Sequence, residues 1–299
     1  MPTRITEGHF VRHFNGRKNL RDSALLDIAQ DHALHLLHAA GLFENALAFK
    51  GGTALRKFRS GHEGRFSTDL DFSAAEAGAA ELLFSALDGA ELDGFRFWIR
   101  ERAGYSHASL HVETPFGSVK IGSSVDVSLR RPWLATELLK PIALPIHGRY
   151  TFTPSITPVL CVEELLAEKL ARYRRVRLAR DLYDLFWFSN KPFDERLVRR
   201  LTYMKVWWDV AKEGRGNRPF DPTEILLDRR ANEFRSEQIA LLTIPVDILG
   251  WLARLRARYQ FLREADAIEQ GLLGCSLASE PEVIKYIEEV ASRASAVYY

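Results

Sequence analysis

Two carboxylates separated by one residue, Asp69 and Asp71, are the side chains of this 299-residue chain that are best placed to do chemistry. They lie in residues 66–72, an Asp-rich segment that predicts a β-strand, and alternate side chains of a strand share one face. Leu70 and Phe72 would then enter the core while both carboxylates project together. Such carboxylates repel each other unless a divalent cation lies between them, and Mg²⁺ or Mn²⁺ takes oxygen ligands from carboxylates and phosphates. The pair therefore predicts a divalent-metal site that acts on a phosphate compound.

A third carboxylate, Asp126, stands in residues 124–129, a second strand-like segment. In a site of this kind a third carboxylate orients the acceptor hydroxyl or shares a second metal ion. The alternative is a strand residue that faces solvent, and the two interpretations have about equal weight. Asp126 is therefore the candidate for a third metal ligand and catalytic residue.

A pair of glycines precedes the carboxylates, after a short apolar run and before a helix-like run. Gly51 and Gly52 would let backbone N–H groups approach a phosphate closely at the beginning of a helix. Lys50 and Thr53 would add a positive charge and a hydroxyl. The order strand, glycine turn, helix and carboxylate strand places phosphate donors and metal ligands in one fold unit. This order is more informative than either motif alone.

The elements that must position these residues follow from hydrophobic periodicity. Residues 20–42 predict an amphipathic helix. Residues 59–65 contain two glycines and several charged groups, and they predict an exposed, mobile loop because burial would remove their hydration. Further strands are predicted at residues 95–99, 108–112, 119–121 and 124–129, and a further helix at residues 75–87.

Prolines at positions 141, 145, 154 and 158 predict an extended segment and a change of domain near residue 155. The later pattern is mainly helical, with helices predicted at residues 162–175, 177–188, 194–211, 224–240, 248–269 and 281–296. We therefore expect an α+β fold. Residues 1–155 would form a mixed β-sheet of the α/β type, and residues 156–299 a mainly α-helical lobe that completes the active site.

The overall composition excludes several classes of protein. The 41 basic and 39 acidic side chains give a net charge of +2, so any site for a polyanion must be local. Cys161 and Cys275 lie far apart without metal-binding spacing, which argues against a disulfide framework or a zinc site and fits a reducing cytoplasm. No apolar run approaches the length of a membrane-spanning helix. We expect a soluble cytoplasmic protein without a membrane partner.

The strongest local positive charge comes from a run of basic side chains: Lys169, Arg172, Arg174, Arg175, Arg177 and Arg180. One interpretation is a solvated helix face with ion pairs four residues apart. The other assigns Lys169 to a triphosphate and several arginines to RNA phosphates. Asp181 and Asp184, three residues apart on a predicted helix, share a face and would position Lys169 or Arg180.

Four motifs in sequence order resemble those of the AbiEii/MenT family of toxin nucleotidyltransferases, a branch of the DNA polymerase β-like nucleotidyltransferase superfamily. They lie at residues 49–55, 65–72, 163–170 and 179–185. Four motifs in order are far more specific than any one of them. The segment between Gly52 and Asp69 is longer than is usual in the superfamily, although the AbiEii branch tolerates such a length.

The resemblance implies a two-lobed enzyme that uses Mg²⁺ to move an NMP unit from an NTP onto an RNA acceptor. In characterised relatives the acceptor is tRNA, which is modified at its 3′ end so that translation stops. Such proteins are toxins, and a cognate antitoxin protein neutralises them. The expected partners are therefore an NTP, an RNA acceptor and an antitoxin.

Site residues follow from the resemblance by position. Asp69 and Asp71 would hold the metal, and Asp181 or Asp184 would support the catalytic site. The residues expected at the nucleotide are Lys50, Gly51, Gly52, Thr53, Arg65, Ser67, Lys169 and Arg180. Among these, Ser67 would lie beside the donor phosphate and Lys169 would contact the triphosphate.

Two other functions are compatible with the same residues. A phosphotransferase would use the glycine turn and the carboxylate pair to move a phosphoryl group onto Ser67 or onto a partner. A non-catalytic module would bind RNA or a protein through the basic helices and would not need Asp69 or Asp71. Labelled NTPs separate the two transfer reactions, because only nucleotidyl transfer retains a label on the α-phosphate.

Overall fold

The computed structural model describes residues 5–14, 16, 18–45, 47–74, 76, 78–104, 106–116, 120–176, 178–216, 221–222, 230–234 and 246–296. The chain divides into two compact units, and the main boundary lies between Leu160 and Cys161. Residues Trp133–Ala135 belong to the second unit although they lie within the sequence of the first. That the helical unit completes an active site stays a prediction.

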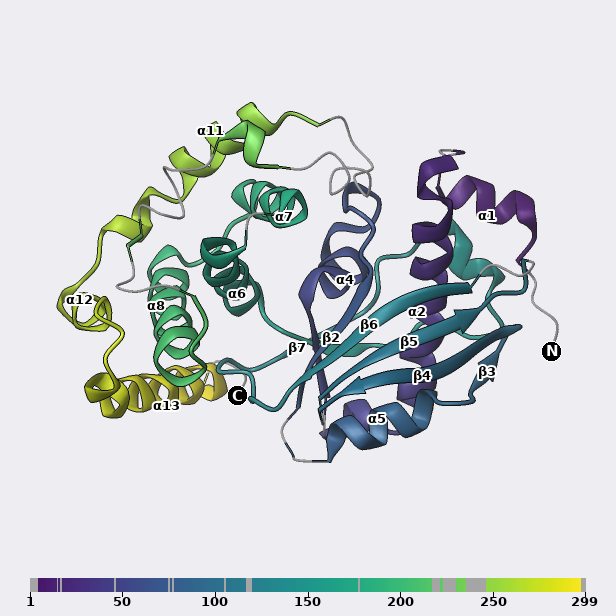
Figure 1. Cartoon of the computed structure of the whole chain (residues 1–299), viewed down its shortest axis with the longest axis horizontal. Helices are drawn as coiled ribbons and strands as arrows, with labels where there is room; N and C mark the ends of the chain where they lie inside the picture. The colour runs from purple at the N-terminus through teal and green to yellow at the C-terminus, as the bar shows by residue number, and fades with distance from the viewer. Residues whose placement is uncertain are drawn as a thin grey trace. The chain divides into compact units, whose positions relative to one another are not determined.

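The first unit contains a mixed sheet of eight strands (Figure 1). Their order is β3 (Glu91–Leu92), β4 (Phe95–Ala103), β5 (His107–Glu113), β6 (Lys120–Ser128), β2 (Asp69–Ala74), β1 (Leu47–Lys50), β8 (Thr157–Val159) and β7 (Glu137–Leu139). Strand β2 pairs in parallel with β6 and antiparallel with β1, and β1 pairs in parallel with β8. Together with the helical second unit, this mixed sheet confirms the predicted α+β fold class.

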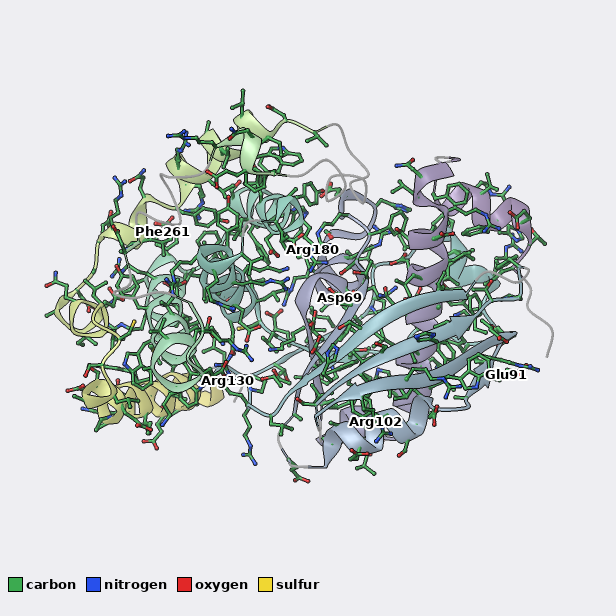
Figure 2. The ribbon with its side chains drawn as sticks, in the orientation of Figure 1. Asp69, Glu91, Arg102, Arg130, Arg180 and Phe261 are labelled. Atoms are coloured by element: carbon green, nitrogen blue, oxygen red, sulfur yellow. The ribbon has the colours of Figure 1, made fainter. Side chains whose placement is uncertain are left out.

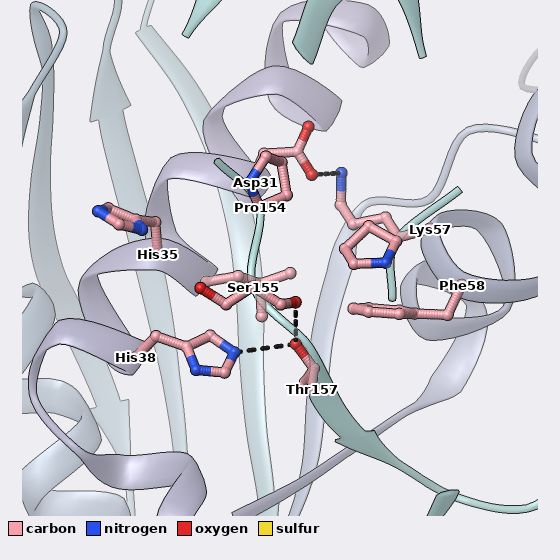
Figure 3. Close-up of a pocket in the computed structure, with 10 residues that line it drawn as sticks. Asp31, His35, His38, Lys57, Phe58, Pro154, Ser155 and Thr157 are labelled. Atoms are coloured by element: carbon pink, nitrogen blue, oxygen red, sulfur yellow. Dashed lines mark hydrogen bonds and ion pairs between the residues drawn. The ribbon is translucent and has the colours of Figure 1, made fainter. Parts of the chain in front are cut away.

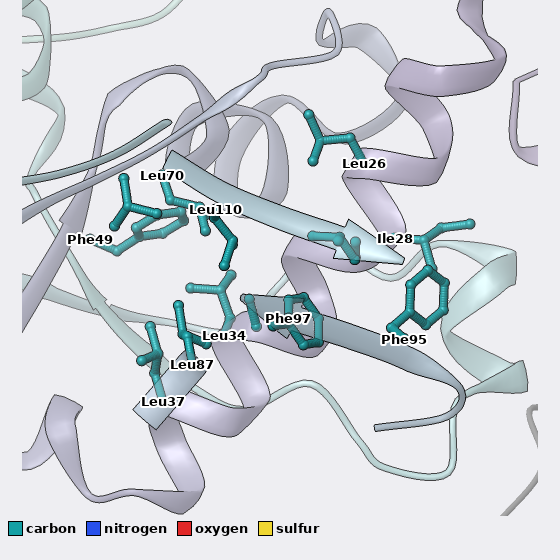
Figure 4. Close-up of a cluster of buried hydrophobic side chains, with 14 of the residues drawn as sticks. Leu26, Ile28, Leu34, Leu37, Phe49, Leu70, Leu87, Phe95, Phe97 and Leu110 are labelled. Atoms are coloured by element: carbon teal, nitrogen blue, oxygen red, sulfur yellow. The ribbon is translucent and has the colours of Figure 1, made fainter. Parts of the chain in front are cut away.

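Two helices, α2 (Arg21–Ala39) and α5 (Ala79–Leu87), pack on one face of this sheet (Figure 1). The core between them and the strands contains Phe49, Leu70, Phe97 and Leu110 (Figure 4). Each fully buried side chain of this size contributes about 1.5–3 kcal/mol relative to an exposed one. On β2 the core residues alternate with half-buried carboxylates, so the polar side chains of β2 share the face that these helices leave open.

The glycine pair begins the short helix α4 (Gly51–Leu55), which continues into a π-helical turn at Arg56–Ser60 and a 3₁₀ turn at Gly61–Glu63. Residues 59–63 of the predicted loop are therefore helical turns, and within residues 59–65 the expected exposure is found at His62 and Glu63. Ser60, Gly61, Gly64 and Arg65 are buried, and the preceding Arg56 and Lys57 are buried with carboxylate partners on α2. Burial removes water from these polar groups, and their ion pairs and hydrogen bonds compensate for that loss of hydration. The other described elements of this unit are two helices, α1 (Glu7–His13) and α3 (Leu42–Asn45), and two 3₁₀ turns, at Lys18–Leu20 and at Pro145–Arg149.

One predicted break in a strand does not exist. Residues 119–121 and 124–129 were expected to form two strands, whereas β6 is continuous over Lys120–Ser128. The reason is that Gly122 and Ser123 pair with His111 and Leu110 of β5, so the small residues lie within a regular ladder.

The second unit is helical, with α6 (Val162–Arg175), α7 (Ala179–Ser189), α8 (Glu195–Trp207), α11 (Ile248–Arg258), α12 (Ala267–Leu272) and α13 (Glu280–Ala296). The predicted helix at residues 248–269 is divided, because Asp266 caps a new helix through the N–H groups of Ile268 and Glu269. The predicted helix at residues 224–240 lies mostly outside the described residues. Among the described residues, no helix is long and apolar enough to cross a membrane.

Candidate functional site

The Asp71 carboxylate lies directly over Gly51. A Cβ placed on Gly51 would be 1.9 Å from Asp71 Oδ2, and the φ angle of Gly51 is +77°, in the left-handed region that favours glycine. In the pairing of β1 with β2, Asp71 is also opposite Lys50. The glycine turn and the carboxylate strand therefore meet at this point, as the order of the motifs predicted.

The second glycine faces two other residues of the carboxylate motif. A Cβ on Gly52 would be 2.5 Å from Arg65 Nη2 and 2.9 Å from Ser67 Oγ. Both side chains are buried: Arg65 donates a hydrogen bond to the carbonyl of Phe66, and the carbonyl of Ser67 accepts one from Gln30. Only a residue without a side chain leaves room for the guanidinium and the hydroxyl at the turn.

Thr53 holds the glycine turn on the carboxylate strand. Its buried hydroxyl donates a hydrogen bond to the carbonyl of Asp69 at 2.5 Å. The structure thus shows this hydroxyl engaged with the backbone of β2, whereas the sequence suggested a contact with nucleotide. Lys50 is half-buried at the end of β1, beside the same turn.

The two candidate metal ligands lie on one face of β2. Asp69, which is labelled in Figure 2, is the first residue of this strand. Both carboxylates are half-buried, and Asp69 Oδ1 accepts a hydrogen bond from Thr68 Oγ1 at 3.0 Å. Carboxylate oxygens on a common face, next to a turn kept open by two glycines, fit a hard divalent cation such as Mg²⁺. Asp69 and Asp71 are the residues that would hold it.

The third carboxylate is adjacent to this pair but is engaged elsewhere. Asp126 of β6 is the parallel partner of Asp71, so the two residues occupy neighbouring positions on the sheet. Its oxygens, however, accept hydrogen bonds from His107 Nδ1 at 2.7 Å and from Ser124 Oγ at 2.8 Å. Within the described part of the chain, no three acidic, histidine or cysteine side chains are grouped as metal ligands.

In the second unit, Lys169 is held between two buried carboxylates. Its Nζ lies 2.6 Å from Asp184 Oδ2 and 3.6 Å from Asp181 Oδ1, and all three side chains are buried. Arg172, which is partly exposed, lies 3.4 Å from the other oxygen of Asp181. The structure therefore brings together Lys169, Asp181 and Asp184, as the helical spacing of the two aspartates suggested, and orients the ammonium group.

The other basic residues do not form one solvated helix face. Arg174 is buried in α6, and Arg175 forms an ion pair with Asp209 at 3.0 Å. Arg180 is half-buried in the first turn of α7 (Figure 2). Arg177 lies outside the described residues. The Arg172 side chain is 37% exposed, against 6% for Lys169 and 22% for Arg175, so it can meet an external anion.

The helical unit contains a second buried charge pair, Glu164 and Lys205, which the sequence pattern did not indicate. Glu164 of α6 accepts hydrogen bonds from Lys205 Nζ at 2.8 Å and from the N–H groups of Trp133 and Leu134. The lysine also lies over the ring of Trp133, 4.2 Å from its centroid. The motif at residues 163–170 contains Glu164, but nothing in the sequence spacing identifies Lys205 as its partner.

A separate cavity in the first unit is too small to be a nucleotide site. It lies among Asp31, His35, Lys57 and Thr157 and has a volume of about 10 Å³, roughly enough for one water molecule (Figure 3). Its walls are tied by the Asp31–Lys57 ion pair and by a hydrogen bond between His38 and Thr157. The carboxylate strand and its glycine turn contribute no residue to it.

Comparisons with known proteins agree with the geometry. The family model of the nucleotidyl transferase AbiEii toxin of type IV toxin–antitoxin systems matches residues 35–264. The structure of MenT4, a nucleotidyltransferase toxin from Mycobacterium tuberculosis, is 43% identical, with a TM-score of 0.92. That match covers 96% of this chain and 99% of MenT4.

A more distant structure, JHP933 from Helicobacter pylori, is 16% identical over 82% of this chain and 96% of that one. Its TM-score is 0.45. No curated protein sequence matches. The family model and MenT4 confirm the resemblance seen in the four motifs: the chain is a nucleotidyltransferase and belongs to the AbiEii family of nucleotidyltransferase toxins.

Proposed function

We propose that this enzyme uses Mg²⁺ to transfer a nucleoside monophosphate from an NTP to the 3′ end of a tRNA, and that this modification blocks translation. Membership of the family supports the general features of this proposal: the protein is a toxin that uses an NTP and a divalent metal, and it has an antitoxin partner. The observation that carries the proposal is the Asp71 carboxylate over Gly51, with Asp69 on the same face of β2.

The residues of the first unit have distinct roles in this reaction. Asp69 and Asp71 hold the divalent cation, which when bound lowers the pKa of the attacking hydroxyl and neutralises charge on the leaving pyrophosphate. Arg65 and Ser67, which lie against Gly52, bind the donor phosphates. Because the glycines have no side chains, these groups approach the turn more closely than they could approach any other residue.

In the second unit, Lys169 is the proposed contact for the triphosphate. Asp181 and Asp184 hold its ammonium group in one position, so little side-chain entropy is lost when a phosphate binds. Arg172 next to it presents a partly exposed positive charge, which suits an RNA phosphate. The tRNA acceptor itself is supported by the resemblance of the four motifs to the family.

The test is a transfer assay with purified protein, Mg²⁺, total tRNA and each of the four NTPs labelled on the α-phosphate. We expect label at the tRNA 3′ end with wild-type protein. Asp69→Asn should lower the rate at least about 100-fold, since it removes charge at the position where the cation binds. The matched control is Glu91→Gln, because Glu91 is an exposed carboxylate on the edge strand of the same sheet (Figure 2).

Two results would contradict the proposal. If no NTP labels tRNA under conditions in which the protein is folded, the tRNA acceptor is wrong. If label is transferred from the γ-phosphate to the protein or to a partner, the enzyme is a phosphotransferase. The Glu91→Gln variant must retain wild-type activity for the loss in Asp69→Asn to be assigned to the site.

A further inference from the structure

Two hydrogen bonds hold the carboxylate of Asp126. One comes from His107 Nδ1 to Oδ1 at 2.7 Å, and the other from Ser124 Oγ to Oδ2 at 2.8 Å. An ionised carboxylate only accepts hydrogen bonds, so Nδ1 of His107 and the hydroxyl of Ser124 are the donors. Each oxygen therefore has a donor, and the orientation of the whole carboxylate is set.

The sheet order gives this orientation a direction. Strand β6 lies between β5 and β2, so His107 on β5 and Asp71 on β2 are on opposite sides of Asp126. The hydrogen bond from His107 therefore engages Oδ1 of Asp126 from the β5 side, which is the side opposite Asp71. This agrees with the finding that the described residues contain no three-ligand metal cluster.

Stability does not explain the His107–Asp126 pair. The two side chains are 38% and 49% exposed, and ion pairs or hydrogen bonds at such exposure contribute little to folding. His111, on the same strand and the same face, is exposed without any hydrogen bond among the described contacts. An exposed dyad next to the carboxylate pair is therefore more readily understood as part of the site.

We propose that His107 is a positioning residue: together with Ser124 it orients the Asp126 carboxylate so that this carboxylate binds the acceptor hydroxyl. The cation is then held by Asp69 and Asp71, and Asp126 is not one of its ligands. This inference rests on the proposed nucleotidyl transfer and assigns the acceptor side of the same site. A carboxylate has about four lone-pair positions, so Asp126 can still accept a hydrogen bond from a substrate hydroxyl while both donors are in place.

The metal half of the inference is tested without any assay of activity. Mn²⁺ alone is titrated into the full chain and free Mn²⁺ is measured by electron paramagnetic resonance. We expect Asp69→Asn to weaken Mn²⁺ binding by roughly tenfold or more, while Asp126→Asn and His107→Ala stay within about threefold of wild type. If Asp126→Asn weakens binding as much as Asp69→Asn does, or if wild-type protein binds no Mn²⁺, the inference is overturned.

The positioning half is tested by transfer kinetics. His107→Ala should lower kcat roughly tenfold and leave KM for the NTP unchanged. His107→Asn should recover most of kcat, because its amide nitrogen lies near the position of Nδ1, whereas His107→Gln places its amide near Nε2 and should not. His111→Ala is the matched control and should behave as wild type, and all variants should keep the wild-type melting temperature.

The two proposals fail in different ways. Wild-type kcat in His107→Ala overturns the positioning role while nucleotidyl transfer stands. If wild-type protein transfers no nucleotide to tRNA, the proposed function fails, and the Mn²⁺ titration still decides whether Asp126 belongs to the metal site.

Discussion

Gly51 is subject to two separate constraints. Its φ of +77° strains any residue with a side chain, and its missing Cβ leaves the space that Asp71 Oδ2 occupies. Gly89 has nearly the same φ, +79°, but nothing lies within 4 Å of the position of its Cβ. Substitutions at Gly51 and Gly89 can therefore be compared to distinguish the effect of backbone strain from the effect of overlap with the Asp71 carboxylate.

We expect Gly51→Ala and Gly89→Ala to destabilise the protein by about 1 kcal/mol each through backbone strain. Only Gly51→Ala should also abolish nucleotide transfer, because its methyl group displaces the Asp71 carboxylate. Urea unfolding measures the first effect and the tRNA labelling assay the second. Equal loss of transfer in both variants would show that strain, and not the position of Asp71, controls activity.

At the scale of elements, α6 and α8 are joined by an ion pair that water hardly reaches. The side chains of Lys205 and Glu164 are both 2% exposed, whereas those of Lys212 and Glu280, another lysine–glutamate pair of this unit, are 32% and 33% exposed. Glu164 also accepts hydrogen bonds from the backbone N–H groups of Trp133 and Leu134, so it attaches the segment Trp133–Ala135 to the helices.

Lys205→Met should lower the free energy of unfolding by about 3–5 kcal/mol, because it leaves Glu164 buried without its counter-charge. Lys212→Met should cost at most about 1 kcal/mol, since solvent screens the exposed pair. Guanidinium unfolding of both variants against wild type gives the comparison. If both variants lost a similar amount of unfolding free energy, burial would not be the reason for the strength of the Lys205–Glu164 pair.

Across the first unit, two buried carboxylates of α2 anchor the segment that follows the glycine turn. Asp27 accepts hydrogen bonds from Arg56, and Asp31 forms an ion pair with Lys57 at 2.7 Å. Burial alone would raise the pKa of Asp31, but Lys57 and His147 outweigh burial and lower that pKa to about 2. The pKa of Asp27 is held well below its usual range, because Arg56 and Lys57 outweigh its burial in the same way.

These lowered pKa values predict a loss of stability in acid. The unfolded chain takes up the proton near pH 4, before the folded protein does, so stability is present above about pH 4 and is lost toward pH 2. Asp31 alone should account for about 2 kcal/mol of the complete loss, of which about 1 kcal/mol is reached at pH 3. Urea unfolding at about pH 6, 4 and 3 measures it, and Asp31→Asn should lose that part of the pH dependence. A protein that becomes more stable on acidification over this range would contradict the assignment.

The sequence alone determined the parts of the site that depend on local spacing. Alternation along a strand placed Asp69 and Asp71 on one face and Leu70 in the core, because the side-chain period of a strand is two. The order of four short motifs identified the family that the comparisons confirmed. Both inferences use neighbours within a few residues or the order of segments, which a sequence displays directly.

The tertiary structure decided which distant residues meet. Arg56 and Lys57 meet carboxylates about thirty residues earlier on α2, and Arg56 also donates hydrogen bonds to the carbonyls of Gly61 and Gly64. The partner of Asp126 depends on the β5–β6 register that brings His107 beside it. Neither pairing leaves a local pattern, because long-range hydrogen bonds and ion pairs form only when register and burial bring their groups together. The contacts of His107 with Asp126 and of Lys205 with Glu164 are of this kind.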